Sequence, residues 1–162
     1  MPKIIIRSRL PWEERWATPT LDQLWEVQKE HHKRVLPAFL EGCGAFDGLE
    51  QSLQWHGEAW MWTIEVNFPQ ADLGGKAQSQ NAFAYVVPRP ETPLVCIPLE
   101  QAFIDAVPMR RLNRFIRDGI KGAKQSTDLH WGKWTPSAQT EVDHLLDLVK
   151  RKHKFLLAQQ DG

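Results

Sequence analysis

Two polar side chains with ligand-binding chemistry fall inside an apolar stripe of a predicted helix. Gln28 and His32 share one side of this helix with the apolar residues Leu21, Trp25, Val35 and Phe39. A buried polar group without a partner costs about 1–3 kcal/mol, so both side chains need a hydrogen-bond partner. Either a backbone carbonyl at the helix edge supplies it, as we also expect for His153 in the last helix, or a small ligand does.

Aromatic residues of the central strands can line a pocket for such a ligand. We predict a ligand-binding site formed by Gln28, His32, Trp60, Trp62 and Tyr85. The indoles also have a purely structural interpretation, because large aromatic side chains are highly buried on average. Four of them, which a stacking platform could also use, are Trp60, Trp62, Trp131 and Trp134. We expect Trp60 and Trp62 to fill the core between the sheet and the helices.

A second candidate site is a run of basic residues on one predicted helical face. Arg110, Arg114, Arg117 and Lys121 recur at spacings of four, three and four, and Lys124 follows in a glycine-containing loop. Guanidinium groups bind phosphate and carboxylate groups with paired donors, so these residues predict an anion-binding surface. An ordinary solvated helix face explains the same pattern. The whole chain has 20 basic and 20 acidic residues, and this balance argues against a nucleic-acid partner.

Carboxylates at a spacing of four, Asp22, Glu26 and Glu30, form a third pattern on the first predicted helix. Hard cations such as iron or calcium prefer oxygen ligands of this type. Lysines and arginines stand three or four residues away, which is the arrangement of helical ion pairs. We therefore predict ion pairs and no metal site.

Catalytic motifs do not support an enzyme. Residues 42–48 depart by one residue from a dinucleotide-binding fingerprint, and the sequence has no P-loop, His-Glu-x-x-His or Gly-x-Ser-x-Gly motif. We predict a non-enzymatic binding module for a small or anionic ligand, without a cofactor. Two alternatives stay open: an enzyme that uses His32 as acid or base, and an interaction protein or nucleic-acid binder that docks through residues 110–121.

Composition places the chain among ordinary globular proteins. It has 162 residues, of which 42% are hydrophobic and 25% are charged. This length and composition predict one domain over residues 18–158. An N-terminal strand or arm at 1–17 precedes the predicted domain, and a frayed tail at 159–162 follows it. Two cysteines, Cys43 and Cys96, are too few for a disulfide framework and predict reduced thiols in the cytoplasm. The apolar run Ile4–Ile6 is too short for a signal peptide, and no run is long enough for a membrane span. A homodimer is compatible with these patterns.

Periodicity and capping signals predict the elements. A helix begins near Thr18, with Thr20 and Gln23 as a capping box, and ends or kinks at Pro37, with Gly42 and Gly44 as a stop. A short helix follows from Asp47 to Leu53. Strands are predicted at residues 3–7, 60–68, 82–87, 94–99 and 128–134, a loop at 69–80, and helices at 100–107 and 109–120.

The last helix is predicted to begin at Thr135 and Pro136. Its basic residues near the carboxyl end, where the helix dipole favours cations, are Lys150, Arg151, Lys152 and Lys154. This order of elements predicts an α+β fold, in which the first and last helices cover an antiparallel sheet of four or five strands.

Two short segments around the aromatic strands give the chain a family resemblance. They are Leu49-Glu50-Gln51-Ser52-Leu53-Gln54-Trp55-His56-Gly57 and Asp118-Gly119-Ile120-Lys121-Gly122-Ala123-Lys124. With the terminal helix, they resemble the YdhG-like superfamily of small bacterial domains over about residues 20–155. Some members of that superfamily have been treated as frataxin-like iron chaperones. The resemblance implies a compact α+β fold and no particular reaction. The chain departs from it in the loop at 69–80, the helix near 100–107 and the number of tryptophans.

Overall fold

The sheet of this protein has six strands, all antiparallel to their neighbours, in the order β1-β2-β3-β4-β6-β5. The structure is a computed structural model, and it describes residues 10–68, 82–126 and 128–160. The strands are β1 (Glu50–Trp55), β2 (Trp62–Asn67), β3 (Ala84–Val87), β4 (Leu94–Glu100), β5 (Lys124–Ser126) and β6 (Leu129–Trp134). The α+β fold is therefore confirmed, with more strands than the four or five predicted.

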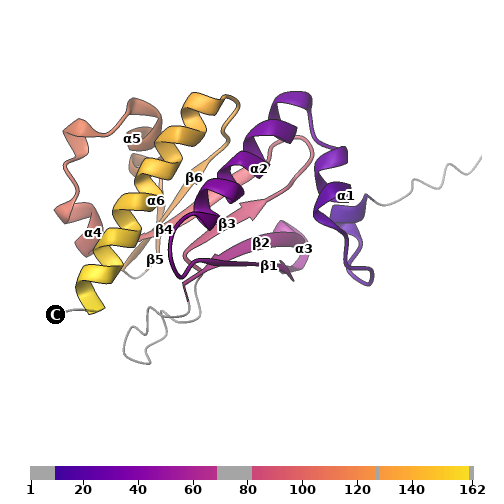
Figure 1. Ribbon diagram of the computed structural model, residues 1–162, viewed down its shortest axis with the longest axis horizontal. Coiled ribbons are helices and arrows are strands. Elements are labelled where there is room, and N and C mark those ends of the chain that lie inside the picture. Colours follow the sequence, from indigo (N-terminus) through magenta and orange to yellow (C-terminus); the bar gives the residue numbers. More distant parts are fainter. Residues whose placement is uncertain (1–9, 69–81, 127, 161–162) are drawn as a thin grey trace, which may run out of the picture.

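Helices precede, interrupt and follow the strands. They are the short 3-10 helix η1 (Pro11–Glu13), α1 (Leu21–Glu26), α2 (Glu30–Gly44), α3 (Gly57–Trp60), α4 (Gln101–Ala106), the 3-10 helix η3 (Met109–Arg111), α5 (Arg114–Lys121) and α6 (Gln139–Gln160). Figure 1 shows α2 and α6 side by side over one face of the sheet. The predicted cover of an early and a late helix is thus present. No described helix is long and apolar enough to cross a membrane.

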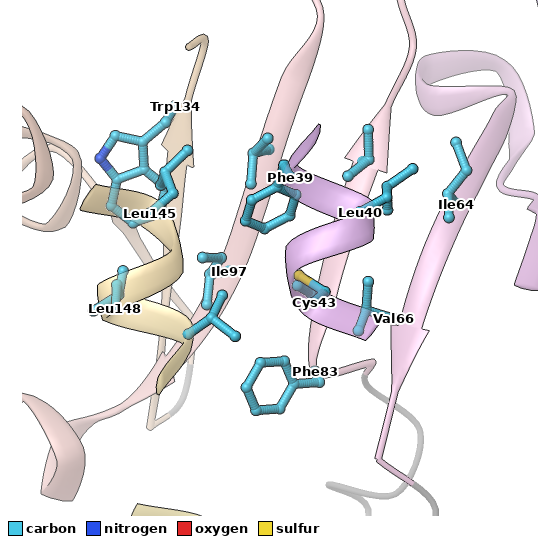
Figure 2. Close-up of a cluster of buried hydrophobic side chains, with 14 of the residues drawn as sticks. Phe39, Leu40, Cys43, Ile64, Val66, Phe83, Ile97, Trp134, Leu145 and Leu148 are labelled. Atoms are coloured by element: carbon cyan, nitrogen blue, oxygen red, sulfur yellow. The ribbon is translucent and has the colours of Figure 1, made fainter. Parts of the chain in front are cut away.

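The core lies between the sheet and the helix pair. In β2, Trp62, Ile64 and Val66 alternate with more polar residues and face the helices, as the period of two predicts. Phe39 from α2 and Leu145 from α6, each with 0% of its surface exposed, meet them from the other side. Figure 2 shows how side chains from both helices and from the central strands converge in this layer.

Close contact between the two helices explains why α2 continues through Gly42 and ends only at Gly44. A Cβ atom on Gly42 would lie 2.5 Å from Cδ1 of Leu146 in α6, so Gly42 permits a close approach between the helices and does not end α2. Pro37 also lies inside α2. The loss of one helical hydrogen bond there is offset by burial of the apolar stripe, which continues through Phe39, Leu40 and Cys43. The predicted stop is therefore confirmed at Gly44, the last residue of α2, whereas Pro37 does not end the helix.

Two other predictions near α2 need correction. The single predicted first helix is broken into α1 and α2, although the capping box of Thr20 and Gln23 at its start is confirmed. The predicted short helix at residues 47–53 is wrong, because residues 50–55 form β1 and pair with β2 along their whole length. Cross-strand pairing outweighs the local capping signal at this position.

The last helix begins at Gln139 instead of Thr135. Glu141 caps it by accepting hydrogen bonds from the backbone nitrogen and the hydroxyl of Ser137 at 2.7 and 3.1 Å.

The other predicted elements have counterparts in the structure. β3, β4 and β6 correspond to the predicted strands at 82–87, 94–99 and 128–134, and α4 and α5 correspond to the predicted helices at 100–107 and 109–120. The predicted strand at 3–7 and the loop at 69–80 lie outside the described residues. Trp12, from the segment before residue 18, is part of the core.

Candidate ligand-binding site

The face of the sheet opposite the core carries a row of side chains that lie opposite one another on four neighbouring strands. Strand register places Glu65 of β2 opposite Tyr85 of β3, Tyr85 opposite Cys96 of β4, and Cys96 opposite Lys133 of β6. Trp131 of β6 lies on the same face and opposite Lys124 of β5. Since β6 lies far from β2, β3 and β4 in the sequence, only the strand order brings Trp131 and Lys133 beside Tyr85 and Cys96.

A cavity of about 430 Å³ opens on this face. Its lining residues are His56, Trp60, Tyr85, Lys124, Ser126, Trp131 and Lys133. Tyr85 occupies a central position among the rings: its ring centroid lies 5.2 Å from that of Trp60, 5.6 Å from that of His56 and 6.1 Å from that of Trp131. The cavity therefore has aromatic walls from β3, from β6 and from the α3 turn with His56 before it.

Backbone geometry at Met61 explains why Trp60 belongs to this cavity. Continued strand alternation would put Trp60 on the same face as Trp62. Met61 instead has φ of 55°, a conformation that L side chains rarely adopt, and it ends the strand register at the α3 turn. The backbone carbonyl of Trp60 accepts hydrogen bonds from Nε1 of Trp12 at 3.0 Å and from the hydroxyl of Thr63 at 3.2 Å. Trp62 fills the core as predicted, whereas Trp60 is only partly buried and packs against both the main core and the cluster of Tyr85 and Cys96.

Polar groups differ between the two ends of the cavity. At one end, Nε2 of His56 lies 2.8 Å from a carboxylate oxygen of Glu65, and both side chains keep about a quarter of their surface exposed (24% and 22%). At the other end lie the two exposed ammonium groups of Lys124 and Lys133 and the hydroxyl of Ser126. The cavity lining thus has a histidine at one end, next to Glu65, which does not itself line the cavity, and net positive charge at the other end.

Burial favours the neutral forms of two ionisable side chains in the floor of the cavity, Tyr85 and Cys96. The hydroxyl of Tyr85 accepts a hydrogen bond from the backbone nitrogen of Ala82 at 3.0 Å, and burial raises the pKa of Tyr85. Cys96 packs beneath Tyr85 and Trp131, and its burial raises the pKa of the thiol to about 12. Because a thiolate is the nucleophilic form of cysteine, Cys96 supports the floor and does not supply a nucleophile at neutral pH.

The predicted ligand site at Gln28 and His32 lies elsewhere, since neither residue lines the cavity. Nε2 of Gln28 donates to the backbone carbonyl of Pro88 at 2.7 Å. Oε1 of Gln28 and Nδ1 of His32 are buried without a hydrogen-bond partner among the described residues. Burial, with His31 and Lys29 nearby, lowers the pKa of His32. Of the five residues predicted together, the structure brings only Trp60 and Tyr85 into one cavity.

The predicted basic stripe is interrupted. Arg110 belongs to η3, and the chain is extended at Leu112 and Asn113 before α5 begins, so the spacing from Arg110 to Lys121 does not describe one continuous helical face. The side chain of Asn113 caps α5 by accepting from the backbone nitrogen of Phe115 at 2.8 Å. Arg114, Arg117 and Lys121 do lie together on α5, and Arg114 pairs with Asp118 at 3.7 Å. Lys124 belongs to the cavity.

The row of carboxylates is also divided, because Asp22 and Glu26 lie in α1 and Glu30 begins α2. Glu30 pairs with Lys33 at 3.3 Å, as the ion-pair interpretation predicts. Among the described residues, no group of three or more His, Cys, Asp or Glu side chains is placed to hold a metal ion.

Buried polar residues of α6 are held by backbone carbonyls. Nε2 of His153 lies 2.8 Å from the carbonyl oxygen of Asp47, which confirms the carbonyl partner expected for this histidine. Lys152, one of the basic residues assigned to the helix dipole, is only 8% exposed and donates to the carbonyls of Phe83 and Pro98 at 2.7 and 2.6 Å. Residues 145, 148, 149, 152 and 156 form one stripe of α6, so position 152 faces the sheet.

Sequence reasoning did not select His56, Ser126 and Lys133 for the site, and it considered Trp131 only as one of four indoles. Trp131 and Lys133 stand two apart on a predicted strand, which places them on one face. The sequence has no signal for which strand lies beside them. No model of a known protein family and no curated protein sequence matches the chain, so the resemblance to the YdhG-like superfamily stays a prediction.

Proposed function

We propose that this protein is a non-enzymatic binding module for a small anionic ligand, which it holds in the cavity on the open face of the sheet. The observation that carries this proposal is the position of Lys124 and Lys133 in the lining of one concave aromatic cavity. Clefts of this kind, apolar with a few polar groups, are the usual form of small-molecule sites, and a volume of about 430 Å³ is within their range.

Charge within the cavity favours an anion over a neutral ligand. The lining residues include the lysines Lys124 and Lys133 and no carboxylate, so their ammonium groups are available to a ligand. No ion pair of either lysine is present among the described residues. The two free thiols, Cys43 and Cys96, are buried and support the proposed cytoplasmic location.

Phenyl phosphate is a suitable probe for the anion site. We expect NMR titration of the wild-type protein at low ionic strength to shift the indole signals of Trp60 and Trp131, and added salt to weaken binding. The double variant Lys124→Gln/Lys133→Gln should bind about tenfold more weakly, because two exposed charge pairs contribute up to about 1 kcal/mol each. Lys150→Gln/Lys154→Gln, on exposed positions of α6, changes the net charge equally and should bind normally.

Equal affinity in both double variants would overturn the proposal. The enzyme that uses His32 as acid or base, the docking surface at residues 110–121 and the homodimer stay predictions that this experiment does not address.

A further inference from the structure

We propose that the ligand of the open-face cavity is a flat aromatic compound that carries an anionic group at one end and a hydrogen-bonding group at the other. This inference rests on the proposed function, because it names the class of anion that the same cavity takes. It depends on the order of side chains across the sheet.

The row of directly opposed residues gives the cavity a long axis. It runs from Glu65 through Tyr85 and Cys96 to Lys133 across four neighbouring strands. Adjacent strands lie about 4.8 Å apart, so three steps separate the carboxylate end from the lysine end by about 14 Å between Cα atoms. A single inorganic ion cannot contact both ends, whereas a ligand of one or two rings can.

Aromatic rings occupy the space between the two ends. The rings of Tyr85 and Trp131 are inclined by only 34°, so together they form a shallow surface in the middle of the row. Trp60 stands at a steep angle of 61° to Tyr85 and closes one side. Cys96, with a small side chain and 0% exposure, lies under this surface and leaves it open above. A flat ring fills such a slot with stacking contacts that a puckered ring cannot make equally well.

Each end then fixes one end of the ligand. Lys124 and Lys133, with the hydroxyl of Ser126, supply donors to a phosphate or carboxylate group. At the opposite end, His56 lines the cavity with its Nε2 2.8 Å from a carboxylate oxygen of Glu65, and its imidazole is the polar group that faces a hydroxyl or amino group of the ligand. The two ends therefore orient the ring in one direction.

A series of phosphate esters tests this ligand class, since the compounds share one anionic group. Calorimetric titration should rank 4-hydroxyphenyl phosphate first, then phenyl phosphate, with cyclohexyl phosphate and inorganic phosphate at least about fivefold weaker than phenyl phosphate. The preference for the hydroxylated ester should disappear in His56→Phe, at the polar residue that lines this end of the cavity. Equal binding of phenyl and cyclohexyl phosphate would overturn the aromatic class and leave anion binding intact. If none of the esters binds in a lysine-dependent way, the proposed function itself fails.

Variants of the aromatic walls provide a second test. Trp131→Leu and Trp60→Leu should each reduce the difference between phenyl and cyclohexyl phosphate, whereas Trp16→Leu, at an indole with 81% exposure outside the cavity, should preserve it. Ring-current shifts of the Trp131 indole signal in the wild-type protein, seen with phenyl but not cyclohexyl phosphate, give the same information without a substitution. Their absence on saturation with phenyl phosphate contradicts stacking.

Single-stranded nucleic acid also presents flat rings and phosphates, and an aromatic sheet can bind it. We expect a deoxythymidine octanucleotide to bind no more tightly than deoxythymidine monophosphate, because the cavity accommodates one or two rings. Affinity that increases strongly with oligonucleotide length would overturn the small-ligand proposal in favour of a nucleic-acid surface.

Discussion

The two faces of the central sheet are built from alternate residues of the same strands, yet they differ in chemistry. On the covered face, Trp62, Ile64 and Val66 of β2 pack against α2 and α6, and each is less than 10% exposed. On the open face, Thr63 and Glu65 of the same strand hold the α3 turn and His56 through polar contacts. The covered face stabilises the fold, and the open face carries the cavity.

Antiparallel sheets often have one packed face and one solvated face. The open face of this sheet is unusual in that aromatic rings gather on it around Tyr85. These rings contribute less to the core, since most of them keep part of their surface exposed. The difference between the faces predicts that substitutions on one will mainly change stability and substitutions on the other will mainly change binding.

The largest expected effect comes from Phe39→Ala on the covered face. Phe39 is fully buried, so its truncation leaves a cavity and should lower the free energy of unfolding by about 3–5 kcal/mol. Trp131→Ala, at a half-buried indole of the open face, should cost no more than about half as much. Urea denaturation of both variants measures the two values. An equally large loss of unfolding free energy for Trp131→Ala and Phe39→Ala would show that both faces contribute equally to stability.

The next effect is a pH dependence from Lys152, whose ammonium group is buried at the edge of the covered layer. Burial lowers the pKa of Lys152 to about 7, against the opposing influence of Glu100 and Cys96. The unfolded chain therefore binds more protons above pH 7, and the free energy of unfolding should increase from pH 7 to 8.5 by at most about 1.4 kcal/mol per pH unit. Denaturation at several pH values measures the slope.

Lys152→Met provides the control for this slope. The variant should be nearly independent of pH between 7 and 8.5, whatever its absolute stability, because the titrating group is gone. Above about pH 9, the buried thiols Cys43 and Cys96 act in the opposite direction, since burial raises the pKa of each to about 12 and the unfolded chain loses their protons first. An unchanged slope in Lys152→Met would assign the dependence to another group.

Gly119→Ala is the next substitution, and it is expected to lower both the stability of the fold and the affinity for the ligand. A Cβ atom on Gly119 would overlap the indole of Trp134, which donates to the carbonyl of Phe115 at 3.0 Å and holds β6 against α5. Overpacking of this kind costs about 1–3 kcal/mol. Since Lys133 precedes Trp134 on β6, the affinity for phenyl phosphate should fall as well.

The matched control is Gly44→Ala at the exposed end of α2. There the nearest atom to the new Cβ is Nε2 of Gln51 at 3.8 Å, which is ordinary contact. Thermal unfolding should show no loss of stability, and a gain is expected from the higher helix propensity of alanine. A similar loss in both variants would mean that the contact with Trp134 is not the cause.

The smallest effect is expected for Tyr85→Phe on the open face. The variant keeps the central ring and removes the hydroxyl that accepts from Ala82, so the free energy of unfolding should fall by about 0.5–1.5 kcal/mol. Binding of phenyl phosphate should change by less than about twofold, because stacking is retained. A much larger loss of affinity would assign the hydroxyl, and not the ring, to the ligand.

Much of the covered face could be predicted from the sequence, and much of the candidate site could not. Alternation in residues 62–68 identifies the buried side of β2, and the stripe of α6 identifies its core side. The same alternation overstates the burial of Trp60, which packs only in part against the core because the turn at Met61 breaks the period. Spacing also misplaces Arg110, since Leu112 and Asn113 separate η3 from α5. In both cases a regular period was extended across a backbone change that the residue types do not signal.

The sequence by itself determined the class of fold, the side of each main element that is buried, and the balanced charge, because these follow from local periodicity and composition. Tertiary structure alone decided that β6 lies beside β4 and β5, and so placed Lys133 and Trp131 next to Tyr85. It also decided that Lys152 is buried, through two carbonyls from β4 and the segment before β3. Strand order and carbonyl placement depend on contacts between distant segments, for which a single sequence has no local pattern.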